Sequence, residues 1–158
     1  MSARLDYSKT DPAAMKAMYG LEHFVHESGL EPSLLELVKL RASLINGCAY
    51  CLDMHTADAL RAGETQQRLA LVSVWREAES FYTDRERAAL EWTEAVTLVA
   101  QTHVPDEVYE HVRPHFTDQE LVNLTMAIVT INGWNRLSIS FRAEPDYSRK
   151  LAEKEQAK

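Results

Sequence analysis

Residues 36–55 read Glu36-Leu-Val-Lys-Leu-Arg-Ala-Ser-Leu-Ile-Asn-Gly-Cys48-Ala-Tyr-Cys51-Leu-Asp-Met-His55, and they contain both cysteines of the chain. Asn46-Gly47 within this stretch is a turn or helix-stop signal, so the sequence predicts a helix, a sharp break and a second helix beginning near Cys48. On that second helix the spacings Cys48–Cys51 (i, i+3) and Cys51–His55 (i, i+4) place all three side chains on one face. Two thiols and an imidazole on one face can carry out thiol redox chemistry or bind a metal ion.

The length and composition are those of one soluble globular domain, which we expect to span residues 1–158. Hydrophobic residues make up 46% of the chain and charged residues 26%. The formal net charge of −7, without any basic block, argues against nucleic acid or an anionic membrane as a partner. We find neither an apolar signal-peptide region nor a run long enough to span a bilayer, so we expect a cytoplasmic chain. In that compartment a CxxC pair indicates a redox or metal site.

The hydrophobic spacing predicts an all-α fold of about seven or eight helices, because no stretch alternates with the period of a strand. Sequences typical of capping boxes begin at Ser33, Thr83 and Thr117. We expect the polar tail, residues 148–158, to be frayed. The expected helices are Pro12–Ser28, Ser33–Ile45, Cys48 to just before Gly63, Thr65–Ala78, Thr83–Gln101, Val108–Val112, Leu121–Ile131 and Trp134–Arg142.

A weak internal duplication links the two halves of the chain. Glu36-Leu-Val-Lys-Leu and Ile45-Asn-Gly-Cys48 are echoed by Glu120-Leu-Val-Asn-Leu and Ile131-Asn-Gly-Trp134, with a slip of two residues between the two landmarks. The pattern predicts two related helix–break–helix units that pack together. When they are aligned on Asn-Gly, the second unit replaces Cys48, Cys51 and His55 by Trp134, Leu137 and Phe141, so it keeps the packing face without the chemistry.

The two cysteines have different environments on the predicted helix. The helix N-terminus favours a thiolate at Cys48, whereas Cys51 has His55 one turn beyond it to accept its proton. Spacing alone leaves open which sulfur attacks. The alternative is that both cysteines are small buried apolar residues. Asp58 could orient His55, or it could simply face solvent.

Glu36 and Tyr50 have two interpretations each. Glu36 either reaches the thiols or is only the last residue of the Ser33 capping box. Tyr50 points to a different face from the cysteines on a regular helix, but it could still lie over the site because a first turn is irregular. Two basic residues, Lys39 and Arg41, could supply positive field near the thiols, although Lys39 could equally lie on a solvated helix face. The remaining histidines, which we expect to be structural or exposed, are His23, His26, His103, His111 and His115.

The pattern E-x11-C-x2-C-x3-H, formed by Glu36, Cys48, Cys51 and His55, strongly resembles the alkylhydroperoxidase D-like branch of the carboxymuconolactone decarboxylase family. The match is dense over residues 31–63 and looser to about residue 142. The resemblance implies an all-helical domain that forms homotrimers or homohexamers. It also implies a thiol peroxidase without a bound cofactor, which reduces hydrogen peroxide or organic hydroperoxides with electrons from a dithiol or lipoyl-type partner.

The resemblance further implies a role for each site residue. Cys51 attacks the peroxide and becomes a sulfenic acid, and Cys48 then condenses with it to a disulfide. Glu36 and His55 relay the thiol proton. Well-studied members carry a second histidine where this chain has Tyr50, and a phenol with a pKa of about 10 is a weaker base. The relay is therefore altered here. The decarboxylase members generally do not depend on a CxxC pair, so its presence argues against that activity.

Two other functions fit the same residues. Cys48, Cys51, His55 and Glu36 are four plausible zinc ligands, although closed structural zinc sites usually collect ligands from separated segments. A ring-forming redox sensor would instead oxidise reversibly without turnover.

Overall fold

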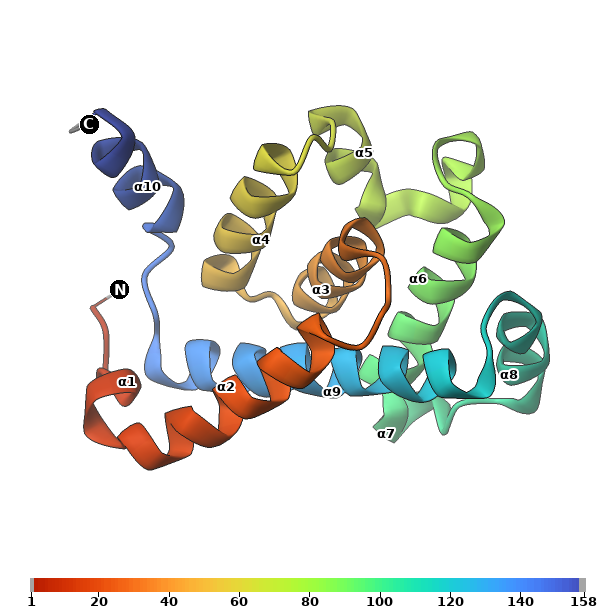
Figure 1. The fold of residues 1–158 in the computed structure, drawn as a ribbon, viewed down its shortest axis with the longest axis horizontal. Helices are drawn as coiled ribbons and strands as arrows, with labels where there is room; N and C mark the ends of the chain where they lie inside the picture. Colours follow the sequence, from red (N-terminus) through yellow and green to blue (C-terminus); the bar gives the residue numbers. More distant parts are fainter. Residues whose placement is uncertain (1, 157–158) are drawn as a thin grey trace.

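A computed structural model describes residues 2–156 of the chain, and within them it contains helices and no strand, which confirms the all-α prediction (Figure 1). The described part has ten α-helices instead of seven or eight, because the sequence did not reveal α1, α7 or α10 and because the last two expected helices are one, α9. The α-helices are α1 (Tyr7–Thr10), α2 (Pro12–His26), α3 (Pro32–Asn46), α4 (Ala49–Arg61), α5 (Gln66–Leu71), α6 (Asp84–Thr97), α7 (Val99–Thr102), α8 (Asp106–Val112), α9 (Asp118–Phe141) and α10 (Tyr147–Gln156). The 3-10 helices are η1 (Val72–Glu77), η2 (Glu79–Phe81) and η3 (Arg113–His115).

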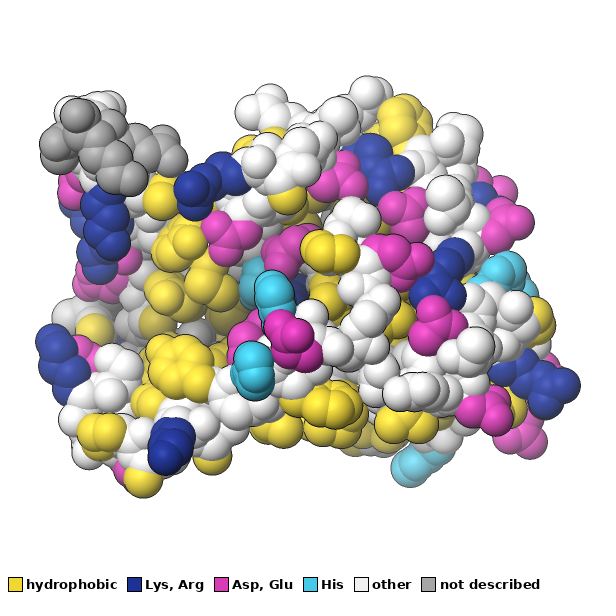
Figure 2. All heavy atoms as spheres, viewed as in Figure 1, with side chains coloured by type: hydrophobic (Ala, Val, Ile, Leu, Met, Phe, Trp, Pro, Cys, Tyr) yellow, Lys and Arg dark blue, Asp and Glu magenta, His cyan; other side chains and the backbone are white. Residues whose placement is uncertain are grey.

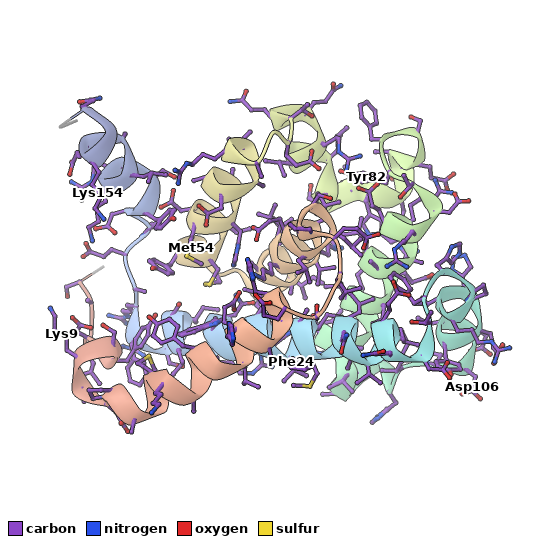
Figure 3. All side chains as sticks on the ribbon, viewed as in Figure 1. Lys9, Phe24, Met54, Tyr82, Asp106 and Lys154 are labelled. Atoms are coloured by element: carbon purple, nitrogen blue, oxygen red, sulfur yellow. A yellow bond between two sulfur atoms is a disulfide. The ribbon has the colours of Figure 1, made fainter. Side chains whose placement is uncertain are left out.

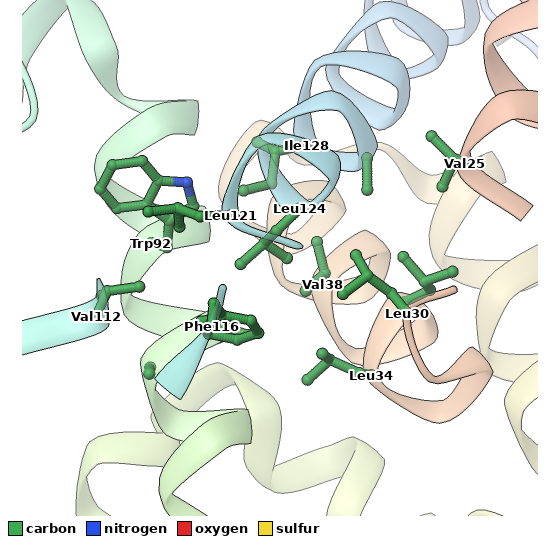
Figure 4. Packing of buried hydrophobic residues seen from close by; sticks show 14 residues of the cluster. Val25, Leu30, Leu34, Val38, Trp92, Val112, Phe116, Leu121, Leu124 and Ile128 are labelled. Atoms are coloured by element: carbon green, nitrogen blue, oxygen red, sulfur yellow. The ribbon is translucent and has the colours of Figure 1, made fainter. Parts of the chain in front are cut away.

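Helix α3 lies at the centre of the fold and packs against α4, α6 and α9. Its Val38 belongs to a core cluster that also contains Trp92 of α6 and Ile128 of α9 (Figure 4). Its Leu37 belongs to a second cluster, formed with η1 and α6. Apolar residues therefore point in several directions from α3, and their burial makes it the rigid element on which the site is built.

The predicted break after α3 is confirmed. Gly47 adopts a left-handed conformation (φ 70°, ψ 36°), which a residue without a Cβ enters at little cost. Two hydrogen bonds close the helix end: the N–H of Gly47 donates to the carbonyl of Leu44 (3.3 Å), and the N–H of Cys48 donates to that of Ser43 (3.0 Å). The chain then reverses, and Cys48 becomes the N-cap of α4.

The matching break predicted at Asn132-Gly133 is wrong, because α9 runs unbroken through it. Asn132 is buried, and its amide donates to the carbonyl of Ile128 (2.9 Å) and to the hydroxyl of Thr97 (3.1 Å). A Cβ added to Gly133 would lie 3.0 Å from the terminal methyl of Met18, so this glycine allows α2 to approach α9 closely. The same dipeptide thus ends one helix and serves packing in the other.

Three further expectations were wrong. Helix α3 begins at Pro32, and its N-cap Glu31 makes no side-chain capping bond, so the Ser33 box is not formed. The expected helix Thr65–Ala78 is α5 followed by η1, with a kink at Val74. The described part of the tail, up to Gln156, belongs to α10 and packs against α4, where the Tyr147 hydroxyl donates to Asp58 (3.0 Å). Residues 157–158 of the expected frayed tail lie outside the described residues. The capping boxes at Thr83 and Thr117 are both confirmed.

The two Asn-Gly units pack against each other through α3 and α9. The amide of Asn46 donates to Asn132 (3.0 Å), its counterpart in the second unit, and to Asn135 (2.8 Å). Asn135 in turn donates to Ser43 (3.0 Å). This buried polar network has its donors matched to acceptors, so it fixes the register of the two helices.

We predict opposite effects of alanine at the two Asn-Gly glycines. Gly47→Ala should lower the free energy of unfolding by about 1 to 2 kcal/mol, because alanine is strained in the left-handed region. Gly133→Ala should leave it unchanged or raise it by up to about 1 kcal/mol, because alanine favours a helix and the flexible tip of Met18 can move. Urea unfolding of both oxidised variants measures this, and equal losses would contradict it.

Candidate active site

The two cysteines form a disulfide at the start of α4. The sulfur of Cys48 also accepts a hydrogen bond from the backbone N–H of Cys51 (3.4 Å), as expected of an N-cap residue. Each cysteine is only 1% exposed, and both pack with Ala42 and Ile131. The predicted position of Cys48 at a helix N-terminus is thus confirmed.

His55 lies two turns along α4, opposite Glu36 on α3. Its Nδ1 is 2.9 Å from Oε2 of Glu36, and the side chains are 7% and 19% exposed. Because the Ser33 box is absent, Glu36 is free to make this contact, and the capping interpretation is wrong. When Nδ1 carries the proton it donates to the carboxylate, which leaves Nε2 with a lone pair to accept a proton.

Lys39 connects this pair to a second carboxylate. Its ammonium, on a side chain that is 11% exposed, lies 2.6 Å from Glu22 of α2 and 3.8 Å from Glu36. The other oxygen of Glu22 accepts a hydrogen bond from the Trp134 indole of α9 (3.1 Å). The alternative of a solvated Lys39 is therefore wrong. Sequence reasoning missed Glu22 and the role of Trp134, because no local spacing links α2 or α9 to the CxxC stretch.

The electrostatics keep Glu36 ionised. Burial alone raises its pKa, but the hydrogen bond from His55 and the positive charges of His55 and Lys39 outweigh burial and lower the pKa below 4.5. An ionised Glu36 can hold the imidazole in one orientation throughout the neutral range. This is the arrangement that a general base and its orienting carboxylate require.

A cavity of about 650 Å³ opens onto the pair, and Cys51 lines it whereas Cys48 does not. It is lined by residues of the segment before α1, of α1, α2, α3, α4 and α9, of the segment that leads into α10, and by Lys150 of α10. Figure 2 shows hydrophobic side chains gathered in a recess between α10, α4 and α2, and Figure 3 shows Met54 on the side of α4 that faces α10. Of the two cysteines, Cys51 is therefore the one that borders this cavity.

Tyr50 lies over the site. It lines the cavity and packs against the cluster that contains Cys48 and Cys51. Burial, followed by the nearby Tyr7, Tyr19 and Asp146, raises its pKa above 10. Tyr50 is consequently a neutral phenol near neutral pH, able to donate a hydrogen bond but not to act as a base there.

The remaining candidates lie elsewhere. Asp58 accepts from Tyr147, so its carboxylate does not orient His55. Arg41 pairs with Glu94 (2.8 Å) and donates to the carbonyl of Ser73, away from the thiols. None of the residues that line the cavity is one of the histidines expected to be structural or exposed: His23, His26, His103, His111 and His115.

The described residues do not form a ready-made metal centre. Within residues 2–156, no group of three or more His, Cys, Asp or Glu side chains is arranged to hold a metal ion. In this state the sulfurs of Cys48 and Cys51 are bonded to each other, and His55 is paired with Glu36.

Within residues 2–156, no helix is both long and apolar enough to cross a membrane.

Comparison with known proteins agrees with this geometry. The model of the carboxymuconolactone decarboxylase family matches residues 12–95, more than half of the chain, and the chain belongs to this family. Within it the chain is alkylhydroperoxidase D-like. A structure of ATU0492 from Agrobacterium tumefaciens, a protein of unknown function described as a candidate antioxidant defence protein AhpD, is 48% identical, has a TM-score of 0.88 and covers 90% of this chain and 97% of its own.

Two further relatives extend the comparison. The uncharacterized protein YdfG of Bacillus subtilis (strain 168) is 44% identical over 140 residues, which are 89% of this chain and 95% of YdfG. The debrominase Bmp8, in complex with 2,3,4-tribromopyrrole, has a TM-score of 0.79 over 93% of this chain and 78% of its own. At 17% identity, this last likeness is one of fold alone.

We predict that Glu36→Gln weakens the acid dependence of stability. The pKa of Glu36 is lowered in the folded state, so its contribution is present above its ordinary value of 4.5 and is lost as the pH falls through the folded pKa. Wild type should lose stability more steeply than the variant in that acidic window, by at most about 1.4 kcal/mol per pH unit. Urea unfolding at several pH values measures both slopes, and parallel slopes would disprove the assignment.

We also predict that the Lys39 ammonium is needed for stability. Lys39→Met should lower the free energy of unfolding by about 2 to 4 kcal/mol, because it leaves the mostly buried Glu36 and the partly exposed Glu22 without their shared cation. Lys9→Met is the matched control, since Lys9 pairs with Asp6 at 3.0 Å but is 86% exposed, and it should cause no measurable change. Chemical unfolding compares the two, and similar losses would mean that burial of the Lys39 pair is unimportant.

Proposed function

We propose that the chain is a thiol-dependent peroxidase that reduces hydrogen peroxide or organic hydroperoxides through Cys51 and Cys48. The observation that carries this proposal is the asymmetry of the disulfide: Cys51 lines the cavity beside the His55–Glu36 pair, and Cys48 lies behind it at the helix N-cap. This asymmetry supports Cys51 as the sulfur that attacks the peroxide and Cys48 as the sulfur that then forms the disulfide with it. Family membership supports the same reading.

In the oxidative half of the cycle, His55 accepts the Cys51 proton and Glu36 stabilises the resulting imidazolium. The thiolate attacks a peroxide oxygen, the O–O bond breaks, and the leaving hydroxide or alkoxide takes a proton from the imidazolium. Cys51 is now a sulfenic acid. Tyr50, as a neutral phenol, can donate a hydrogen bond to the departing oxygen but does not replace the second histidine of well-studied members as a base.

In the second step Cys48 loses its proton, its thiolate attacks the Cys51 sulfur, and the S–O bond breaks. The leaving hydroxide takes up the proton that Cys48 lost and departs as water. The product is the Cys48–Cys51 disulfide, the form that the structure contains. A dithiol or lipoyl-type partner then returns two electrons and two protons to regenerate both thiols. The identity of this partner, and the homotrimeric or homohexameric assembly that the resemblance implies, belong to the same proposal.

The proposal predicts distinct products in the single-cysteine variants after one equivalent of peroxide. The intact mass of reduced wild type should fall by two hydrogens and its free thiols should disappear. Cys48→Ser should gain one oxygen as a trapped Cys51 sulfenic acid, and Cys51→Ser should not react at this rate. His55→Gln should slow the oxidation of Cys51 by roughly 10²-fold or more, because general base catalysis is lost. His26→Gln, on the exposed side of α2, is the control and should behave as wild type.

Other outcomes identify the rival functions. Two unreacted thiols after prolonged exposure to peroxide would exclude a peroxidase. Stoichiometric zinc in the reduced, chelator-washed protein would favour a metal-binding module. Reversible oxidation without multiple turnover, with dithiol and lipoyl-type donors supplied in excess, would favour a redox sensor.

A further inference from the structure

The cavity beside Cys51 has an aromatic wall. Trp134 and Tyr50 pack against the cluster that holds the two sulfurs. The ring of Tyr19 lies 5.4 Å from that of Trp134 at a tilt of 50°, and Tyr7 lines the same space. Aromatic rings bind flat apolar groups by offset or tilted stacking, and a further ring adds to an existing pair. The wall is thus suited to a substrate that carries a ring.

The size of the cavity also favours a substrate larger than hydrogen peroxide. Hydrogen peroxide is little larger than water, whose share of liquid volume is about 30 Å³, and it needs no such room. The volume of about 650 Å³ falls in the range of sites that enclose drug-sized ligands. Most of this space is available for the organic body of a substrate whose reacting bond is at Cys51.

The charges next to Cys51 disfavour an anion. Two lysines line the cavity, and each is already paired with a carboxylate. Lys39 is shared between Glu22 (2.6 Å) and Glu36 (3.8 Å), and Lys150 lies 2.8 Å from Asp146. A carboxylate-bearing substrate would compete with these residues for their lysines, and close to Cys51 it would meet two carboxylates against one ammonium. An uncharged substrate has no such penalty.

We infer that the cavity takes an uncharged hydroperoxide whose organic body carries an aromatic ring, with the ring against Trp134 and Tyr19 and the O–O bond at Cys51. This inference rests on the proposed peroxidase function and names its substrate class. The hydroperoxide takes two electrons from the cysteine pair, its O–O bond breaks, and it leaves as the corresponding alcohol and one water, while the two thiols become the disulfide.

The test is the rate of thiol loss in the reduced wild-type chain, with no reductant present, so that only the oxidant occupies the cavity. The oxidants are hydrogen peroxide, tert-butyl hydroperoxide, cumene hydroperoxide and the para-carboxylate of cumene hydroperoxide. Each second-order rate constant is divided by that of a small free thiol, which removes differences in intrinsic reactivity. We expect cumene hydroperoxide to exceed hydrogen peroxide and tert-butyl hydroperoxide by at least tenfold, and its carboxylate to react at least tenfold more slowly than cumene hydroperoxide.

Two variants of α2 test whether the aromatic wall causes this preference. Tyr19→Ala should lower the ratio of the cumene to the hydrogen peroxide rate constant by about fivefold to tenfold, and Tyr19→Phe should restore it, because the ring and not the hydroxyl makes the contact. Phe24→Ala is the matched control. Phe24 is an exposed aromatic residue of the same helix (Figure 3). It is not one of the residues that line the cavity, so this variant should keep the wild-type ratio.

The outcomes separate this inference from the function on which it rests. Three results would overturn the substrate class and leave the peroxidase function intact. They are equal corrected rate constants for all peroxides, a para-carboxylate that reacts as fast as cumene hydroperoxide, and a Tyr19→Ala ratio equal to that of wild type. Thiols that survive every peroxide would overturn both.

Discussion

The left-handed backbone of Gly47 is the constraint on which the geometry of the site depends. It ends α3 and turns the chain back, so that Cys48 caps α4 and the next turns of α4 return along α3. Because the reversal takes only two residues, Cys51 and His55 face the side of α3 that carries Glu36, and the 2.9 Å contact between His55 and Glu36 follows. A longer or looser connection would separate His55 from Glu36. One backbone angle therefore brings these side chains of two helices together.

The second requirement of the site is charge compensation. A buried carboxylate next to an imidazole is costly unless a cation offsets it, and here one ammonium serves two carboxylates. Glu22 comes from α2, Lys39 and Glu36 from α3, and the indole that holds Glu22 comes from Trp134 on α9. The cluster thereby ties three helices together at the point where the cavity reaches Cys51. The interactions that stabilise the fold there also keep Glu36 ionised, so structure and reactivity are difficult to separate by mutation of any one member.

The sequence predicted the break at Gly47, the start of a helix at Cys48 and two of three capping boxes, because each depends on neighbours within one or two turns. It did not predict what depends on distant contacts. Asn132-Gly133 carries the same local signal as Asn46-Gly47, yet α2 packs on Gly133 and the helix continues. Ser33 has the residues of a capping box, but Pro32 already begins the helix. The tail reads as polar and unpartnered, and its contacts are with α4, about ninety residues away in the chain.

The two Asn-Gly units have similar sequences but different structures, and this difference explains how the cavity acquires its aromatic wall. Trp134 stands where the first unit has Cys48, and because α9 does not break, its indole lies in the middle of a helix instead of at a helix cap. From there it packs against the sulfur cluster and donates to Glu22. The first unit needs a break to place a sulfur at a helix start, and the second needs continuity to present an aromatic surface. Two similar sequences thus supply different halves of one cavity, because packing against α2 gives the two glycines different tasks.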